Sequence, residues 1–158
     1  MEKMPLAYVK GGKVIGDGHR FDAIEKLKEL GKKYGHVYVM DLDGVRRNEP
    51  NLSIYRKLSH KPFLWIDSLP RHLEDVMDIV IAGAEKVTIG DILSDDELGK
   101  IRDLCDIEIF LRGNDEEEVA DKVKRFGFDG AVLVSPKESV DVPAWGVYPE
   151  EGMVKKLG

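Results

Sequence analysis

The chain lacks residues on which several functional classes depend. Cys105 is the only cysteine among 158 residues, so no intrachain disulfide can form. A lone thiol is expected to behave as a small core residue in a reducing compartment, which predicts the cytosol. No apolar run approaches the roughly 18 residues that a membrane-spanning helix needs, and no signal-like segment follows Met1. We therefore expect no membrane partner.

Positive charge is also scarce. The chain has 24 Lys and Arg against 30 Asp and Glu, a formal charge of -6 that repels nucleic-acid phosphates and anionic lipid, so nucleic acid is not an expected partner. The charged share of 34% is common in heat-adapted proteins, which suggests a thermophilic source. Neither a metal nor a cofactor is predicted, because the four histidines, His60 among them, form no ligand pattern with one another or with a cysteine.

What the sequence does contain is a regular alternation of short β-branched runs and longer stretches with helical spacing. The predicted buried strands are Val37–Met40, Phe63–Ile66, Lys86–Ile89, Ile107–Leu111 and Gly130–Val134. The predicted helices are Phe21–Leu30, Leu73–Val80, Leu98–Leu104 and Val119–Phe126. The strands start roughly 21 to 26 residues apart, about the length that one strand, one helix and two connections require.

The two ends of the chain depart from this alternation. Tyr8–Ile15 is predicted as a first strand and a small hairpin turned at its two glycines. With it, about six strand-helix units predict a single α/β domain over residues 1–158, either a shortened TIM-type (β/α) barrel or an open parallel sheet. After Ser135 the pattern fades, so residues 136–158 are expected to form a tail that packs on the body, and a short helix from Glu150 is one option.

Two carboxylates, Asp41 and Asp43, come at the end of a predicted strand, where barrel enzymes hold their chemistry. The segment Tyr38–Gly44, together with Asn51, resembles the second-strand motif of the ProFAR isomerases of histidine biosynthesis and of their cyclase relatives. Three further segments are similar to the same family: Pro5–Val14, Arg71–Val76 and Gly83–Gly90. The resemblance covers roughly residues 5 to 134 and implies a barrel of phosphosugar-isomerase ancestry.

The departures from the family carry as much information as the matches. By this resemblance, Tyr8 and Phe110 stand where the family has its two proton-transferring aspartates, and neither side chain replaces a carboxylate near neutral pH. The family's phosphate-binding glycine run is matched by Asp67–Leu69, whose carboxylate would oppose an anion. The chain is most similar to a mainly archaeal branch of isomerase-related proteins, in which an aspartate also follows strand three. We therefore expect no ProFAR isomerase activity.

The candidate catalytic residues are the strand-end aspartates Asp41, Asp43 and Asp67, which parallel strands would place along one rim. With Asp91 they would form an acidic ring suited to a divalent or cationic ligand. The alternative, which we favour, is that these carboxylates cap turns and accept hydrogen bonds from loop amides.

The candidate ligand-binding residues on the same rim are Arg71, Gly90, Asp91 and Arg112. The two arginines either hold the phosphate or carboxylate of a small anionic metabolite or pair with the neighbouring aspartates. Both interpretations stay open from the sequence.

Two functions follow from these observations. The first is a non-catalytic or diverged descendant of the isomerases that binds a small ligand; the second is a phosphosugar isomerase or lyase that uses the strand-end aspartates. The missing proton donors and phosphate cradle favour the first. Six units would leave open sheet edges or a strained barrel, so we also expect a homodimer that covers them.

Overall fold

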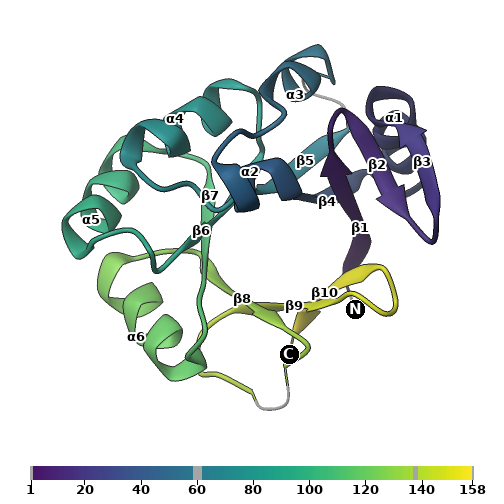
Figure 1. The fold of residues 1–158 in the computed structure, drawn as a ribbon. Helices are drawn as coiled ribbons and strands as arrows, with labels where there is room; N and C mark the ends of the chain where they lie inside the picture. The colour runs from purple at the N-terminus through teal and green to yellow at the C-terminus, as the bar shows by residue number, and fades with distance from the viewer. Residues whose placement is uncertain (1, 59–61, 137–138, 158) are drawn as a thin grey trace.

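The computed structural model describes residues 2–58, 62–136 and 139–157. Within these residues, one sheet closes into an eight-stranded barrel with helices around it (Figure 1). The barrel strands, in chain order, are β1 (Lys3–Lys10), β4 (His36–Asp41), β5 (Phe63–Asp67), β6 (Lys86–Gly90), β7 (Glu108–Arg112), β8 (Gly130–Val134), β9 (Ala144–Tyr148) and β10 (Met153–Leu157). All five predicted internal strands are therefore present.

The barrel is parallel from β1 through β9, and β10 closes it by pairing antiparallel with both β9 and β1. The expected α/β barrel is confirmed, but the expected count of about six strand-helix units is wrong. Residues 136–158 do not simply pack on the body as a tail, because the described part of this segment supplies the last two barrel strands. The helix considered from Glu150 is also wrong, since the chain turns at Gly152 (φ +63°) into β10.

The helices lie outside the barrel: α1 (Ala23–Tyr34), α2 (Leu42–Arg47), α3 (Leu52–Leu58), α4 (Leu73–Ile81), α5 (Asp95–Leu104) and α6 (Glu116–Phe126). The four predicted helices are confirmed, whereas the short α2 and α3 were not expected. Ser94 and Glu97 form a capping box at the start of α5. At α6 the cap is Asp115, which accepts hydrogen bonds from the N–H groups of Glu117 and Glu118. None of the helices in the described ranges has the length and apolar character to cross a membrane.

Alternate residues of each strand face two separate cores. The outward residues pack against the helices, as Val39, Ile66 and Ile89 do. The inward residues fill the barrel lumen with large side chains: Met4, Tyr38, Trp65, Phe110, Val132, Trp145, Val147 and Val154. The ring centroid of Trp65 lies 4.4 Å from that of Phe110, 4.9 Å from that of Tyr38 and 5.3 Å from that of Trp145. The lumen is therefore a packed aromatic core.

Two further strands, β2 (Lys13–Gly16) and β3 (His19–Asp22), extend the sheet beyond the barrel. The first half of β1 pairs with β10, and its second half pairs with β2. The expected hairpin at Gly11 and Gly12 is thus confirmed, and β3 adds a third strand at its side. We call residues 8–22 the N-terminal ledge; in Figure 1 it projects from the right-hand side of the barrel.

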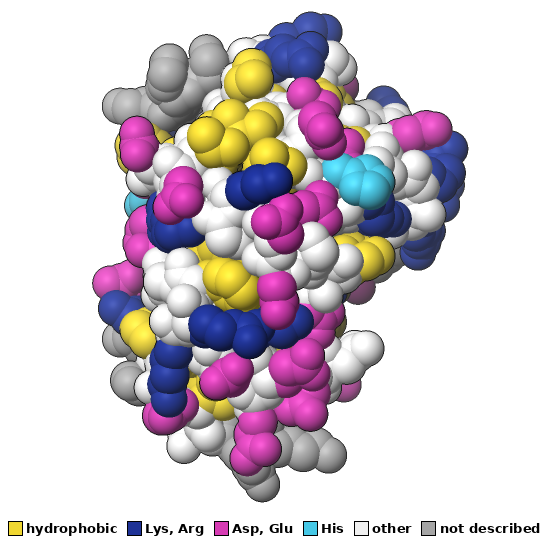
Figure 2. Space-filling view, turned by 90° about the vertical axis from the view of Figure 1, so that its left-hand side faces the viewer, with side chains coloured by type: hydrophobic (Ala, Val, Ile, Leu, Met, Phe, Trp, Pro, Cys, Tyr) yellow, Lys and Arg dark blue, Asp and Glu magenta, His cyan; other side chains and the backbone are white. Residues whose placement is uncertain are grey.

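The opposite side of the molecule is covered by α4, α5 and α6. Exposed hydrophobic side chains here include Ile81, Ile92 and Leu104. Figure 2 shows that the hydrophobic side chains on this face form separate groups between acidic and basic ones. Because the barrel also closes on itself, the open sheet edges that motivated the expected homodimer are not part of it, and a dimer needs another surface.

Candidate functional site

The first predicted site residue, Asp41, caps the helix that follows its strand. It ends β4 and is fully buried, and its carboxylate accepts hydrogen bonds from the N–H groups of Gly44 (2.9 Å) and Asn51 (2.8 Å) and from the hydroxyl of Tyr55. Burial first, and then the charge of Asp41, raise the pKa of Tyr55 well above its usual value. Asp41 thus points away from the lumen and holds local structure together.

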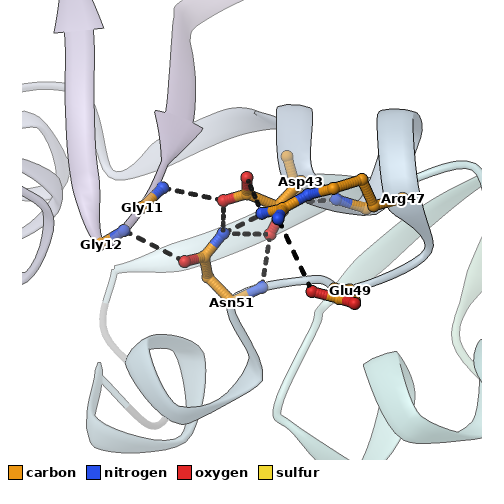
Figure 3. A network of polar contacts seen from close by, with 8 residues as sticks. Gly11, Gly12, Asp43, Arg47, Glu49 and Asn51 are labelled. Carbon is orange, nitrogen blue, oxygen red and sulfur yellow. Dashed lines mark hydrogen bonds and ion pairs between the residues drawn. The ribbon is translucent and has the colours of Figure 1, made fainter.

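Asp43 joins the same network to the turn of the ledge (Figure 3). Its carboxylate accepts hydrogen bonds from the N–H of Gly11 (2.8 Å), from Nδ2 of Asn51 (3.0 Å) and from Arg47 (2.8 Å). The side-chain oxygen of Asn51 in turn accepts from the N–H of Gly12 at 3.1 Å. Burial alone would raise the pKa of Asp43, but these hydrogen bonds outweigh it and lower the pKa. We call Asp41, Asp43 and Asn51 the hairpin brace, because they fix the β1–β2 turn.

Asp67 lies on the opposite face of the sheet, buried in the lumen at the end of β5. Arg112, at the end of β7, donates to both of its oxygens, from Nε at 2.8 Å and from a terminal nitrogen at 3.1 Å. The Tyr38 hydroxyl donates a further hydrogen bond to Asp67 at 2.7 Å. Burial disfavours the charged guanidinium, but Asp67 outweighs this effect and raises the pKa of Arg112. The pair is therefore a bidentate ion pair inside the barrel.

The other polar groups of the lumen complete this network. The Tyr38 hydroxyl also lies 3.0 Å from the hydroxyl of Thr88, to which the Trp65 indole donates at 2.8 Å. Among the described residues, no buried side-chain nitrogen or oxygen lacks a hydrogen-bond partner. Burial, followed by the charge of Asp67, raises the pKa of Tyr38 well above its usual value. The lumen thus holds its polar groups in a saturated arrangement.

Tyr8 and Phe110, which the resemblance would place where the ProFAR isomerases have their aspartates, contribute no carboxylate. Phe110 packs on Trp65 in the lumen. Tyr8 is half-buried near the end of β1, and burial raises the pKa of its phenol. Neither group is suited to exchange a proton with a substrate near neutral pH.

Of the remaining rim residues, Gly90 ends β6, whereas Arg71 lies in the loop between β5 and α4. Arg71 donates to the backbone carbonyls of Gly44 (3.2 Å), Val45 (2.7 Å) and Leu69, so its guanidinium connects the β5–α4 loop to α2. Leu69 has a left-handed backbone (φ +50°), and its Cδ1 would lie 2.6 Å from a Cβ at Gly90. Because Gly90 has no side chain, the side chain of Leu69 can pack against its backbone.

Asp91 is the strand-end aspartate with the fewest contacts. It is partly exposed, and its carboxylate packs so closely on Gly113 that a Cβ there would lie 2.4 Å from Oδ2. Its charge helps to raise the pKa of Arg112. Within the described residues its side chain is absent from the hydrogen bonds and ion pairs of the rim. The structure thus separates the four aspartates: Asp41 and Asp43 in the brace, Asp67 in the lumen and Asp91 at the edge of the mouth.

A hollow of about 740 Å³ lies on the ledge, and the sequence interpretation had not identified it. Tyr8 and Ile15 line it, together with three cationic side chains: Lys10, Lys13 and Arg20. Cross-strand pairing places Lys10 opposite Lys13, and Ile15 opposite both Tyr8 and Arg20, so these side chains share one face. This face continues the lumen side of β1, where Met4 and Leu6 face inward.

The cationic side chains of the hollow form no ion pairs with the described residues. None of Lys10, Lys13 and Arg20 takes part in an ion pair with another described residue, although fourteen such pairs occur elsewhere. Directly opposed lysines have Cβ atoms about 4.5 to 5.5 Å apart and repel each other. Asp17 lines the hollow, and Asp22 stands opposite Lys13 but accepts a hydrogen bond from the Glu25 N–H at 3.1 Å. An anion would relieve this repulsion.

A sequence signal for the cationic hollow was present, because Lys10 and Lys13 flank a Gly-Gly turn.

No metal-binding group of three or more His, Cys, Asp or Glu side chains is formed by the described residues, and His60 lies outside them.

No family model matches the chain, and no curated protein matches it. The similarity to the ProFAR isomerases thus rests on the residues quoted for it above.

Proposed function

We propose that this protein is a non-catalytic, ligand-binding relative of the ProFAR isomerases that holds a small anionic metabolite on its N-terminal ledge. The observation that carries the proposal is the hollow of about 740 Å³ in which Lys10, Lys13 and Arg20 converge without ion-pair partners among the described residues. In a chain with a net charge of -6, a site with three cationic side chains that form no ion pair with the described residues favours anions. Tyr8 and Ile15 line the same hollow and provide apolar surface for the body of the ligand.

The hairpin brace supports the same proposal. Asp43 and Asn51 bind the N–H groups of Gly11 and Gly12, so the turn between Lys10 and Lys13 is fixed before a ligand arrives. Preorganisation of this kind lowers the entropic cost of binding. Asp41 and Asp43, two of the three catalytic candidates, would then act on the ligand indirectly, by positioning the two lysines.

A catalytic function on the strand-end aspartates has less support. Asp41 and Asp43 accept several hydrogen bonds each, and Asp67 is paired with Arg112 inside a filled lumen. An isomerase or lyase needs a carboxylate that can reach the substrate and exchange a proton with it. Only Asp91 on this rim combines partial exposure with few contacts, and a single carboxylate does not supply both acid and base.

Thermal unfolding with simple anions tests the proposal. Inorganic phosphate, pyrophosphate and citrate are titrated against the wild-type protein, Lys10→Ala/Lys13→Ala and the control Lys57→Ala, whose lysine is exposed on α3. A ligand at 100 times its Kd stabilises by about 2.7 kcal/mol, which raises Tm by several degrees. We expect saturable shifts in the wild type and the control and none in the double variant. Equal shifts in all three, or none in any, would rule out the ledge as the site.

The catalytic alternative has its own test, an assay of ProFAR isomerisation in protein free of the host enzyme. Losing one acid or base costs about 10²- to 10⁴-fold, so the loss of both should leave no turnover above background. Turnover abolished by Asp91→Asn would support the alternative and refute the non-catalytic function.

A further inference from the structure

The outer strand of the ledge, β3, ends the sheet and leaves one edge of its backbone open. It pairs with β2 alone, and its four residues are exposed. Elsewhere in the described sheet, the barrel strands pair on both sides. An open edge presents N–H and C=O groups that another strand can bind.

The hairpin turn determines which groups of β3 face this edge. Asp17 (φ +47°) and Gly18 (φ +76°) form a two-residue turn between Gly16 and His19, which are paired. Residues that flank such a turn exchange hydrogen bonds with each other, and the pattern alternates along the strand. His19 and Phe21 therefore direct their backbone groups toward β2. Arg20 and Asp22 direct theirs outward.

The outward face is complementary to itself. We infer that β3 pairs antiparallel with β3 of a second copy, about a two-fold axis that passes through Phe21. This register places Arg20 opposite Asp22 of the second copy and brings the outward-facing backbone groups of the two residues together. It also places opposite charges across the strands and one Phe21 ring beside the other, both of which stabilise antiparallel pairs.

Two observations distinguish the edge of β3 from edge strands whose charged side chains prevent pairing with another strand. Protective edges carry side chains that repel a copy of themselves, whereas Arg20 and Asp22 have opposite signs and lie two residues apart. Phe21 is 45% exposed, with its ring beside His19 (centroids 5.8 Å apart) and under the Lys26 ammonium (4.7 Å). A second Phe21 would cover this ring. Since each β3 has only four residues, the dimer is expected to be weak and to depend on concentration.

Disulfide trapping tests the register directly. At the two-fold axis, residue 21 faces its own copy as a close, non-hydrogen-bonded pair, within reach of a disulfide. Phe21→Cys should therefore form a covalent dimer under mild oxidation, much faster than the control Asp17→Cys on the same hairpin. Cys105 is present in both and is buried, so it does not distinguish them. Equal rates, or no dimer of Phe21→Cys at high protein concentration, would overturn the inference.

Sedimentation over a range of concentrations tests the charge pairing. Arg20→Glu should shift the protein to monomer, and Arg20→Glu/Asp22→Lys should restore the dimer because it exchanges the two charges. Lys57→Glu serves as the matched control on α3. Circular dichroism verifies that α1, whose N-cap is Asp22, stays helical in the variants. A wild type that stays monomeric throughout, or a dimer that Arg20→Glu leaves unchanged, would contradict pairing through β3. Because Arg20 also lines the hollow, anion binding is measured separately, with Lys10→Ala/Lys13→Ala.

Discussion

The barrel lumen and the N-terminal ledge present the same face of one sheet, yet they treat polar groups in opposite ways. In the lumen, Asp67 has Arg112 and Tyr38 as partners, and aromatic rings fill the remaining space. On the ledge, Lys10 and Lys13 face each other beside an open hollow. Polar groups that already have partners stabilise the fold and offer a ligand few free charges or hydrogen-bonding atoms. This difference supports our proposal that the lumen stabilises the fold and that the ledge binds the ligand.

The largest effect is expected from removing the strands that complete the lumen. A chain that ends at Ser135 loses β9 and β10, and with them Trp145, which packs on Trp65. It would expose the edges of β1 and β8 and open the aromatic core to water. We expect no cooperative unfolding transition in urea, and binding of a hydrophobic dye. A cooperative transition like that of the full chain would show that residues 136–158 are an accessory tail after all.

The next effect concerns the ion pair of the lumen. Asp67→Ala leaves the Arg112 guanidinium without its partner in a mostly buried place, and breaking such a pair costs about 3 to 5 kcal/mol. The double variant Asp67→Leu/Arg112→Leu removes both charges and should be less destabilised than the single one. Urea unfolding at pH 7 measures both. A single-variant loss below about 1 kcal/mol would mean that solvent reaches the pair.

A smaller effect with a defined pH dependence is expected at the hairpin brace. Asp43→Asn should cost about 1 to 3 kcal/mol at pH 7, because the carboxylate accepts hydrogen bonds from Gly11, Asn51 and Arg47. The pKa of Asp43 is lowered by folding, so its contribution is present above the ordinary carboxyl pKa of about 3.9. It is lost as the pH falls through the lowered value.

Stability is therefore compared between the wild type and Asp43→Asn across pH 2 to 7, with the exposed ledge residue Asp17→Asn as the control. The difference between the wild type and Asp43→Asn should shrink toward acid pH, and the control should show little difference at any pH. A gap for Asp43→Asn that widens toward acid pH would contradict the brace.

The smallest effect is expected on the ledge. Lys13→Gln removes one of two opposed positive charges, so the free energy of unfolding should stay within about 0.5 kcal/mol of the wild type or rise slightly. Lys57→Gln on α3 provides the reference for an isolated lysine. Chemical denaturation at low salt gives the comparison. A loss above about 1 kcal/mol would show that Lys13 supports the fold instead of a ligand.

The strand-helix alternation was readable because each β-branched run lies between helical stretches of similar length. The end of the barrel was not predicted, because β9 and β10 follow each other without a helix and so break this alternation. Trp145, Val147 and Val154 point into the lumen, whereas Ala144 and Leu157 pack in the outer core. A hairpin of this kind closes the barrel with far fewer residues than two strand-helix units, and its period differs from that of the preceding units.

The candidate site shows a similar division. The shared rim of Asp41, Asp67, Gly90 and Arg112 followed from parallel strands, and the structure places all four at neighbouring strand ends. The direction of each side chain did not follow, because a one-residue difference in strand end turns it to the other face. Asp41 therefore faces the helices while Asp67 faces the lumen. The ledge hollow depends on β3, whose pairing with β2 brings Arg20 beside Ile15, and that pairing has no strong sequence signal.

The most direct measurement is a nuclear magnetic resonance titration of the labelled wild-type protein with pyrophosphate. The indoles of Trp65 and Trp145 both lie in the lumen, and the backbone amides of residues 8–22 report on the ledge. The account predicts saturable shifts of the ledge amides while the two indole N–H signals stay in place. Saturable movement of the indole signals with unchanged ledge amides would place the binding site in the lumen and contradict it.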